Sequence, residues 1–160
     1  MPPEGLDWVP RDELLTFEEI ERVSKLLVEQ FGIESIRITG GEPTVRAHLP
    51  VLIKILSQLP VDLSMTTNGA TLRTLSNDLV QAGLKRINIS LDSLRADRFA
   101  ELTLRDNLPQ VLDGIQAAVD SGLNPVKVNM VVMAGVNDDE IIDFARFGRE
   151  YGVIAVSYTH

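Results

Sequence analysis

The sequence predicts an α/β fold, namely a full or partial (β/α) barrel with about four βα units and the start of a further strand. Two observations predict it. Segments in which apolar residues alternate with polar ones are followed in turn by segments with helical periodicity, and the connections are short. This order is typical of parallel strands joined by right-handed crossovers. With 160 residues, the chain has the length of one domain, covering residues 1–160.

The first predicted helix has clear boundaries. Thr16 and Glu19 form a capping box at its start, and Gly32 ends it. Apolar residues at helical spacing lie between them. The further predicted helices are 49–59, 72–82, 97–104, 108–121 and one that an Asn137 cap opens and that ends near 151. The predicted strands are 35–39, 61–68, 86–92, 126–133 and a fifth that begins at 153–156.

The first four strands each have an apolar face and a polar face. The polar sets are Arg37 and Thr39; Ser64, Thr66 and Asn68; Asn88, Ser90 and Asp92; and Lys127 and Asn129. One strand with a polar face could be an edge strand, but four consecutive parallel strands cannot all be edges. We therefore expect a curved sheet whose concave polar face lines a cavity. The alternative is a flat sheet with one uncovered, wet face, which parallel sheets rarely have.

The first strand ends in a glycine pair, Gly40 and Gly41, followed by Glu42 and Pro43. Two residues without a Cβ allow the backbone to take positive φ or to lie against a ligand. In a barrel of this kind, ligand contacts gather at the carboxyl ends of the strands. The glycine pair stands at such an end.

Two cations, Arg37 and Lys127, point to the predicted cavity of an acidic protein. Burying them unpaired is costly, so a bound anion such as a phosphate would be a natural partner. Alternatively, each cation pairs with a cavity carboxylate such as Asp92. The residues alone leave both possibilities open. The acidic run Asp138–Glu140 is interpreted as helix capping and dipole complement rather than as a metal site.

The composition excludes several classes of protein. A net charge of −8 argues against nonspecific binding of nucleic acid or of an anionic membrane. The absence of cysteine excludes disulfides, thiolate metal sites and a cysteine nucleophile. No signal peptide or membrane span is recognisable, so a cytoplasmic location is expected. The sequence does not predict an oligomeric state.

Several motifs, in this order and spacing, resemble one family. They are Arg37-Ile38-Thr39-Gly40-Gly41-Glu42-Pro43, Thr66-Thr67-Asn68-Gly69, Asn88-Ile89-Ser90-Leu91-Asp92-Ser93, Lys127-Val128-Asn129 and Gly135-Val136-Asn137-Asp138-Asp139-Glu140. The family is molybdenum cofactor biosynthesis protein A, the GTP 3',8-cyclase of the radical S-adenosylmethionine (SAM) superfamily. The resemblance runs from Met1 to about Val156 and implies a radical-SAM-type partial TIM barrel.

The resemblance assigns roles to matching residues. Gly40, Gly41, Glu42 and Ser90 match positions that hold S-adenosylmethionine, whereas Arg37, Thr66 and Lys127 match positions that hold GTP. In the family, a reduced 4Fe-4S cluster splits S-adenosylmethionine. The resulting radical takes a hydrogen from the GTP ribose, and rearrangement gives the cyclised precursor of molybdopterin.

The sequence also departs from the family. The cluster cysteines of the family fall just ahead of Met1, together with its first strand, and the tail Ser157–His160 leaves the pattern of the fifth strand. Cluster ligation needs thiolates, so the chain alone is expected to bind no cluster and to show little or no activity. Both edges of the sheet should be exposed. Two alternatives are a catalytically dead, truncated remnant and a non-enzymatic GTP-binding module.

Overall fold

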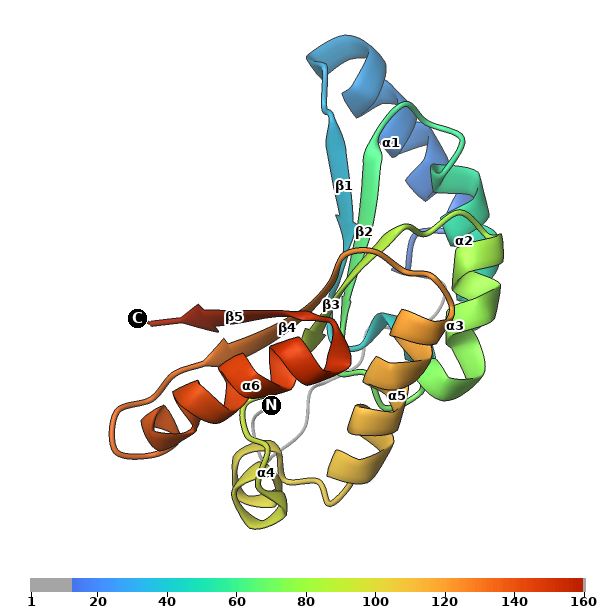
Figure 1. Ribbon diagram of the computed structural model, residues 1–160. Coiled ribbons are helices and arrows are strands. Elements are labelled where there is room, and N and C mark those ends of the chain that lie inside the picture. The colour runs from blue at the N-terminus through green and yellow to red at the C-terminus, as the bar shows by residue number, and fades with distance from the viewer. Residues whose placement is uncertain (1–12, 160) are drawn as a thin grey trace.

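In the computed structural model, five parallel strands form one sheet in the order β1-β2-β3-β4-β5 (Figure 1). The structure describes residues 13–159. The strands are β1 (Ser35–Ile38), β2 (Asp62–Thr67), β3 (Arg86–Ser90), β4 (Val126–Val131) and β5 (Ile154–Tyr158). Sequential strands are neighbours throughout, as successive right-handed crossovers require.

Helices cover one face of this sheet, and the other face is left open (Figure 1). The helices are α1 (Phe17–Phe31), α2 (Leu49–Leu56), α3 (Leu72–Gln81), α4 (Ala96–Thr103), α5 (Leu108–Asp120) and α6 (Ile141–Tyr151), with short 3-10 helices η2 (Pro43–Val45) and η3 (Asp138–Glu140). The strands change direction markedly from β1 to β5, so the sheet is curved rather than flat. This confirms the predicted partial barrel.

The core lies between the apolar face of the sheet and the helices. Met65, Ile89 and Val128, one from each of three central strands, are fully buried. The helical layer is packed closely enough to need a glycine: a Cβ on Gly114 of α5 would lie 2.1 Å from the carbonyl oxygen of Gly69.

Helix α1 begins as predicted but packs less than its sequence suggests. Thr16 and Glu19 form the capping box, with hydrogen bonds of 2.8 and 3.2 Å, and Gly32 ends the helix at φ 65°. However, its apolar stripe is largely exposed, and Phe31 is 70% exposed. The helix flanks the edge strand β1, and an apolar groove of about 300 Å³ separates α1 from β1 and α2.

The prediction that the Asn137 side chain caps the last helix is wrong. Asn137 makes no capping hydrogen bond to η3 or α6, because its side chain is used elsewhere. The fifth strand, expected to begin at 153–156, continues through Ser157 and Tyr158, although these residues depart from the sequence pattern of the family. They stay in the strand because they pair with Met130 and Val131 of β4, and Val132 N–H donates to the Tyr158 carbonyl at 2.8 Å.

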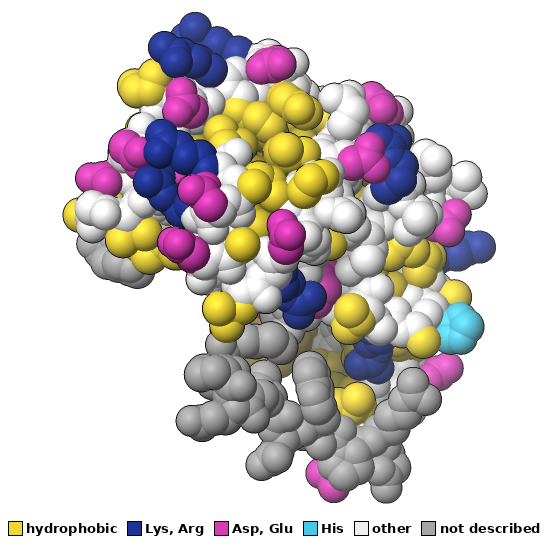
Figure 2. Space-filling model, turned by 90° about the horizontal axis from the view of Figure 1, so that it is seen from below, with side chains coloured by type: hydrophobic (Ala, Val, Ile, Leu, Met, Phe, Trp, Pro, Cys, Tyr) yellow, Lys and Arg dark blue, Asp and Glu magenta, His cyan; other side chains and the backbone are white. Residues whose placement is uncertain are grey.

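Seen from below, the surface carries charges of both signs, and basic and acidic side chains lie around a patch of apolar ones (Figure 2). Within residues 13–159, no helix is long and apolar enough to cross a membrane.

Candidate functional site on the open face of the sheet

The strand register arranges the polar side chains in rows across the open face. Arg37, Ser64 and Arg86 are partners across β1, β2 and β3. In the next row toward the carboxyl ends, Asn88 lies between Thr66 and Lys127. The predicted polar face is therefore one continuous surface across neighbouring strands.

The register brings the two predicted cations together. Arg37 and Lys127 line one hollow of about 100 Å³ on this face. Its other lining residues are Ser64, Arg86, Asn88 and Pro125. Thr66 does not line the hollow, but it lies directly across from Asn88. The three residues expected to hold GTP are thus within one small region.

Neither cation has the carboxylate partner that was the alternative. Among the ion pairs of the described residues, none includes Arg37 or Lys127. Asp92, the carboxylate considered for them, instead accepts a hydrogen bond from Val131 N–H at 2.8 Å. The arrangement is therefore suited to receiving an anion.

Sequence reasoning missed a third cation, Arg86. The alternation of the third strand was followed only from Asn88 onward, although Arg86 has the same parity and so lies on the same face. Its guanidinium pairs with Asp62, and Arg86 Nε is buried without a hydrogen-bond partner. Following the two-residue period back to the start of the strand would have found it.

The glycine turn after β1 is open on its outer side. Gly40 has φ +142°, and within residues 13–159 an added Cβ on Gly40 or Gly41 would meet no atom within 4 Å apart from its chain neighbours. Both glycines are exposed. A ligand could therefore contact this backbone directly, as the resemblance predicts.

Glu42, in contrast, points its carboxylate into the protein. It accepts hydrogen bonds from Thr44 N–H and Thr44 Oγ1 at 3.0 and 2.7 Å, and from Thr67 Oγ1 and Asn68 N–H at 2.7 Å each. Both carboxylate oxygens are used. Glu42 thus ties the glycine turn to the end of β2, and in this structure it is a support of the turn.

Ser90, the remaining residue expected at the cofactor, is exposed at the end of β3. Its partner across the sheet is Asn129 of β4. Asn129 Oδ1 is buried and has no hydrogen-bond partner among the described residues. This end of the sheet therefore offers a hydroxyl and a free amide acceptor side by side.

A buried polar network fixes the loops next to Ser90. The fully buried Asn137 donates to the carbonyls of Asp92 and Val131 at 2.8 and 2.9 Å. Glu140, also fully buried, accepts from Ser93 Oγ at 2.8 Å, from Leu94 N–H at 2.7 Å and from Arg98 Nη1 at 2.5 Å. The interpretation of Glu140 as a helix cap is therefore wrong, because its carboxylate binds the β3–α4 loop and Arg98 of α4.

The other acidic residues of this run are at the surface. Asp139 pairs with Arg98 at 2.6 Å and with Arg95 at 2.9 Å, and the hydrogen bond from Arg98 lowers the pKa of the Asp139 carboxyl. Asp138 accepts from Gly135 N–H at 3.0 Å. Residues 13–159 contain no group of three or more acidic or histidine side chains placed to hold a metal ion.

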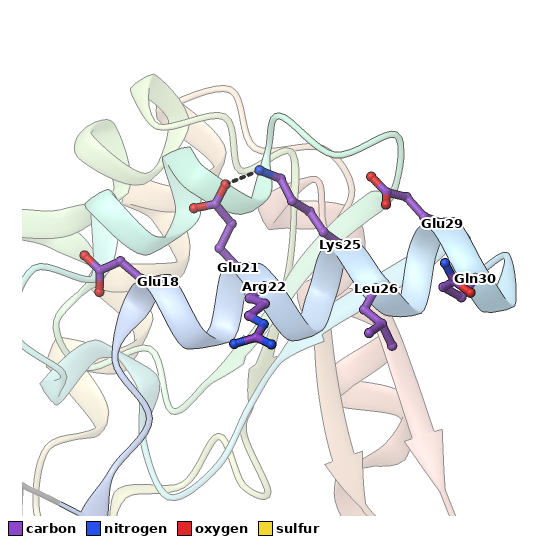
Figure 3. A pocket seen from close by; sticks show the side chains of 7 residues that line it. All are labelled: Glu18, Glu21, Arg22, Lys25, Leu26, Glu29 and Gln30. Carbon is purple, nitrogen blue, oxygen red and sulfur yellow. Dashed lines mark ion pairs between the residues drawn. The ribbon is translucent and has the colours of Figure 1, made fainter.

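A second hollow, of about 400 Å³, lies on the outer face of α1 (Figure 3). Its lining side chains all belong to this one helix and have both charges. Lys25 and Glu21 already pair at 2.6 Å, which raises the pKa of Lys25. This is a solvated surface of a single helix: Arg22 is exposed and stands beside the carboxylates of the same helix, whereas Arg37 and Lys127 come together from two strands on a polar sheet face.

Comparisons with known proteins show the family of this chain. The model of the Radical SAM superfamily matches residues 5–148. A GTP 3',8-cyclase of Listeria welshimeri is 47% identical over 152 residues, which are 94% of this chain and 45% of that protein. Another, of Alkaliphilus metalliredigens, is 49% identical and is covered to 46%. The chain thus spans about half the length of the curated relatives it matches.

Solved structures share the fold. Streptococcus suis SuiB, bound to its precursor peptide SuiA, matches 92% of this chain with a TM-score of 0.74 and 20% identity, and the match covers 33% of SuiB. TYW1 with a lysine-pyruvate adduct bound matches 90% of this chain with a TM-score of 0.66 and 20% identity, over 53% of TYW1. Sequence motifs, strand order and family match agree, and the chain belongs to the radical SAM superfamily.

Proposed function

We propose that the chain is the nucleotide-binding and cofactor-binding central part of a GTP 3',8-cyclase, an enzyme of molybdenum cofactor biosynthesis. One observation carries the proposal: Arg37 and Lys127 line the same hollow on a polar sheet face without a carboxylate partner within residues 13–159. Identity of 44–49% to curated GTP 3',8-cyclases supports GTP as the anionic ligand.

In this proposal, Arg37 and Lys127 bind phosphate oxygens. The hydroxyl of Thr66, at the neighbouring position on β2, donates a hydrogen bond to GTP. A phosphate oxygen is an acceptor that forms charge-assisted hydrogen bonds with both cations. The hollow of about 100 Å³ is smaller than a typical ligand pocket. It therefore suits part of the triphosphate, with the base and sugar farther along the open face.

S-adenosylmethionine also fits the residues present. The open backbone of Gly40 and Gly41 and the exposed Ser90 hydroxyl would hold it, and Glu42 would keep the glycine turn in place. Bound there, S-adenosylmethionine would supply the adenosyl group from which the family generates its radical. In this proposal, the cofactor would lie at the carboxyl ends of β1 and β3 and GTP on the open face of the same sheet, so that the two ligands could react.

The 4Fe-4S cluster does not fit this chain. Its irons are held by cysteine thiolates, and the 160 residues contain no cysteine. We therefore propose that this chain alone does not cleave S-adenosylmethionine. A catalytically dead remnant and a non-enzymatic GTP-binding module are the alternatives.

Isothermal titration of the 160-residue chain with GTP tests the proposal. We expect binding, and we expect Lys127→Ala to weaken it by about tenfold through loss of one charged contact. Lys54→Ala is the matched control, because Lys54 is exposed on α2, away from the open face. Equal affinity of both variants, or no binding by the folded chain, would contradict the proposal.

A titration with S-adenosylmethionine separates the alternatives. Binding of both ligands supports the central part of a cyclase, whereas binding of GTP alone supports a GTP-binding module. A folded chain that binds neither ligand is a remnant.

A further inference from the structure

The hollow on the open face contains more positive charge than the proposed GTP contacts account for. Arg37, Arg86 and Lys127 line it together, and Asp62, paired with Arg86, is the one carboxylate that the ion pairs of the described residues place on them. This concentration of positive charge stands out in a chain with a net charge of −8. A doubly charged phosphate group would balance it.

The geometry points to Arg86 as a third anion-binding residue: we propose that it binds the terminal phosphate of a nucleoside triphosphate together with Arg37 and Lys127. This inference rests on the proposed nucleotide site and deepens it. Neighbouring strands are roughly 4.8 Å apart, so the backbone of Arg86 lies about 10 Å from that of Arg37, two strands away. Lys127 lies on the strand next to Arg86, diagonally opposite it, because Lys127 pairs with Asn88. Side chains of this length can converge on one phosphate over that span.

The position of Arg86 along its strand fits the far end of a nucleotide. Ser90, at the proposed cofactor region, lies four residues farther along β3, which corresponds to roughly 13 Å. A substrate whose sugar lies near Ser90 would therefore extend its phosphates toward Arg86, at the amino end of the sheet. Lys127, across from Asn88, lies between these two levels.

The guanidinium of Arg86 also has unused donors. It has five N–H groups, and the structure gives it an ion pair with Asp62 through Nη2, whereas Nε is buried without a partner. An unpaired buried donor is unfavourable. Because Asp62 and a phosphate would compete for the same guanidinium, the pair with Asp62 keeps Arg86 in place but leaves it available for a stronger anion.

The test measures binding of inorganic tripolyphosphate and of GTP to the 160-residue chain by isothermal titration. Arg86→Ala should weaken tripolyphosphate binding by about tenfold, and Arg86→Lys, which keeps the charge but loses the planar fork, should weaken it less. Arg73→Ala is the matched control, because Arg73 also pairs with an aspartate, Asp113, but lies on α3. The Arg73→Ala variant should bind tripolyphosphate as tightly as the unchanged chain.

Asp62→Asn distinguishes an anion contact from a purely structural ion pair. If Arg86 binds the phosphate, this variant should bind tripolyphosphate at least as tightly as the unchanged chain, since a competing carboxylate is gone. Equal losses in Arg86→Ala and Asp62→Asn would instead show that the pair merely supports the fold, and would overturn the inference.

The two probes separate this inference from the proposed function. GTP binding that Arg86→Ala and Arg86→Lys leave unchanged overturns the role of Arg86 and leaves the proposed function standing. Tripolyphosphate binding that depends on Arg86, without GTP binding, supports Arg86 and contradicts the proposed function. A folded chain that binds neither probe overturns both.

Discussion

Gly40 and Gly41 are adjacent glycines that differ in backbone conformation. Both face open space, yet only Gly40 has a positive φ, at +142°. Among the described residues, a Cβ at Gly41 therefore meets no atom beyond its chain neighbours and needs no strained backbone, so packing and backbone conformation do not explain a glycine at this position. Close approach of a ligand to the backbone would explain it.

We expect Gly41→Ala to keep the stability of the chain while weakening S-adenosylmethionine binding, because its methyl group occupies the space of the ligand. Gly40→Ala should cost about 1 kcal/mol of stability through its backbone conformation. Urea unfolding and cofactor titration measure the two effects. Unchanged cofactor affinity in Gly41→Ala would argue against this turn as the binding site.

Glu42 stabilises the glycine turn, because its carboxylate accepts four hydrogen bonds from other residues of the protein. Glu42→Ala should lower the free energy of unfolding by about 2–3 kcal/mol, since it leaves the buried Thr67 hydroxyl and nearby N–H groups without their charged acceptor. The exposed Glu101 on α4 provides the control, Glu101→Ala. If the two variants unfold at the same urea concentration, Glu42 does not support the turn.

Between elements, the contact of α5 with the β2–α3 turn leaves no room for a side chain. Gly114→Ala places a Cβ 2.1 Å from the Gly69 carbonyl oxygen, which is backbone and cannot rotate away. We expect a loss of about 3 kcal/mol or more, at the upper end of overpacking effects. Gln116→Ala, whose side chain bonds only to Asp120 on the same helix, should change the urea midpoint little. A stable Gly114→Ala variant would refute this packing.

The stability that the ion pair between Asp139 of η3 and Arg98 of α4 contributes should depend on pH. Because Arg98 lowers the pKa of Asp139, the stability from this pair is present above the ordinary aspartate pKa of about 3.9 and is lost as the pH falls through the lowered value. Asp139→Asn should therefore be less stable than the unchanged chain at pH 7, by a small amount for an exposed pair. Urea unfolding from pH 7 to pH 3 should show this difference shrink once the pH falls below the ordinary aspartate pKa, and a constant difference would contradict the assignment.

Most elements could be predicted from the sequence because their signals are local. The capping box at Thr16, the glycine after Phe31 and the two-residue period of each strand depend on neighbouring residues alone. The roles of Glu42, Asn137 and Glu140 could not, because each depends on a partner from another part of the chain. Glu42 and Asn68, for example, are 26 residues apart.

For the whole molecule, the curved open sheet explains why the polar face can be a binding surface. The helices bury the apolar face, whereas on the other face Arg37 is exposed and most of the remaining polar side chains are half-buried, with Ser64 buried among them. In the described sheet, β1 and β5 each have one neighbouring strand, as the sequence predicted. The exposed apolar stripe of α1 was not predicted, because periodicity shows which residues share a face but not what covers it.

The central claim is that the open face of the sheet binds the triphosphate of GTP. A nuclear magnetic resonance titration of the 15N-labelled chain with GTP tests it most directly. We predict that the largest shift changes fall on the amides of Thr66, Asn88 and Lys127, with smaller ones on Arg37 and Arg86, and none on the outer face of α1. Changes confined to the helical side, or no changes at GTP saturation of a folded chain, would contradict the claim.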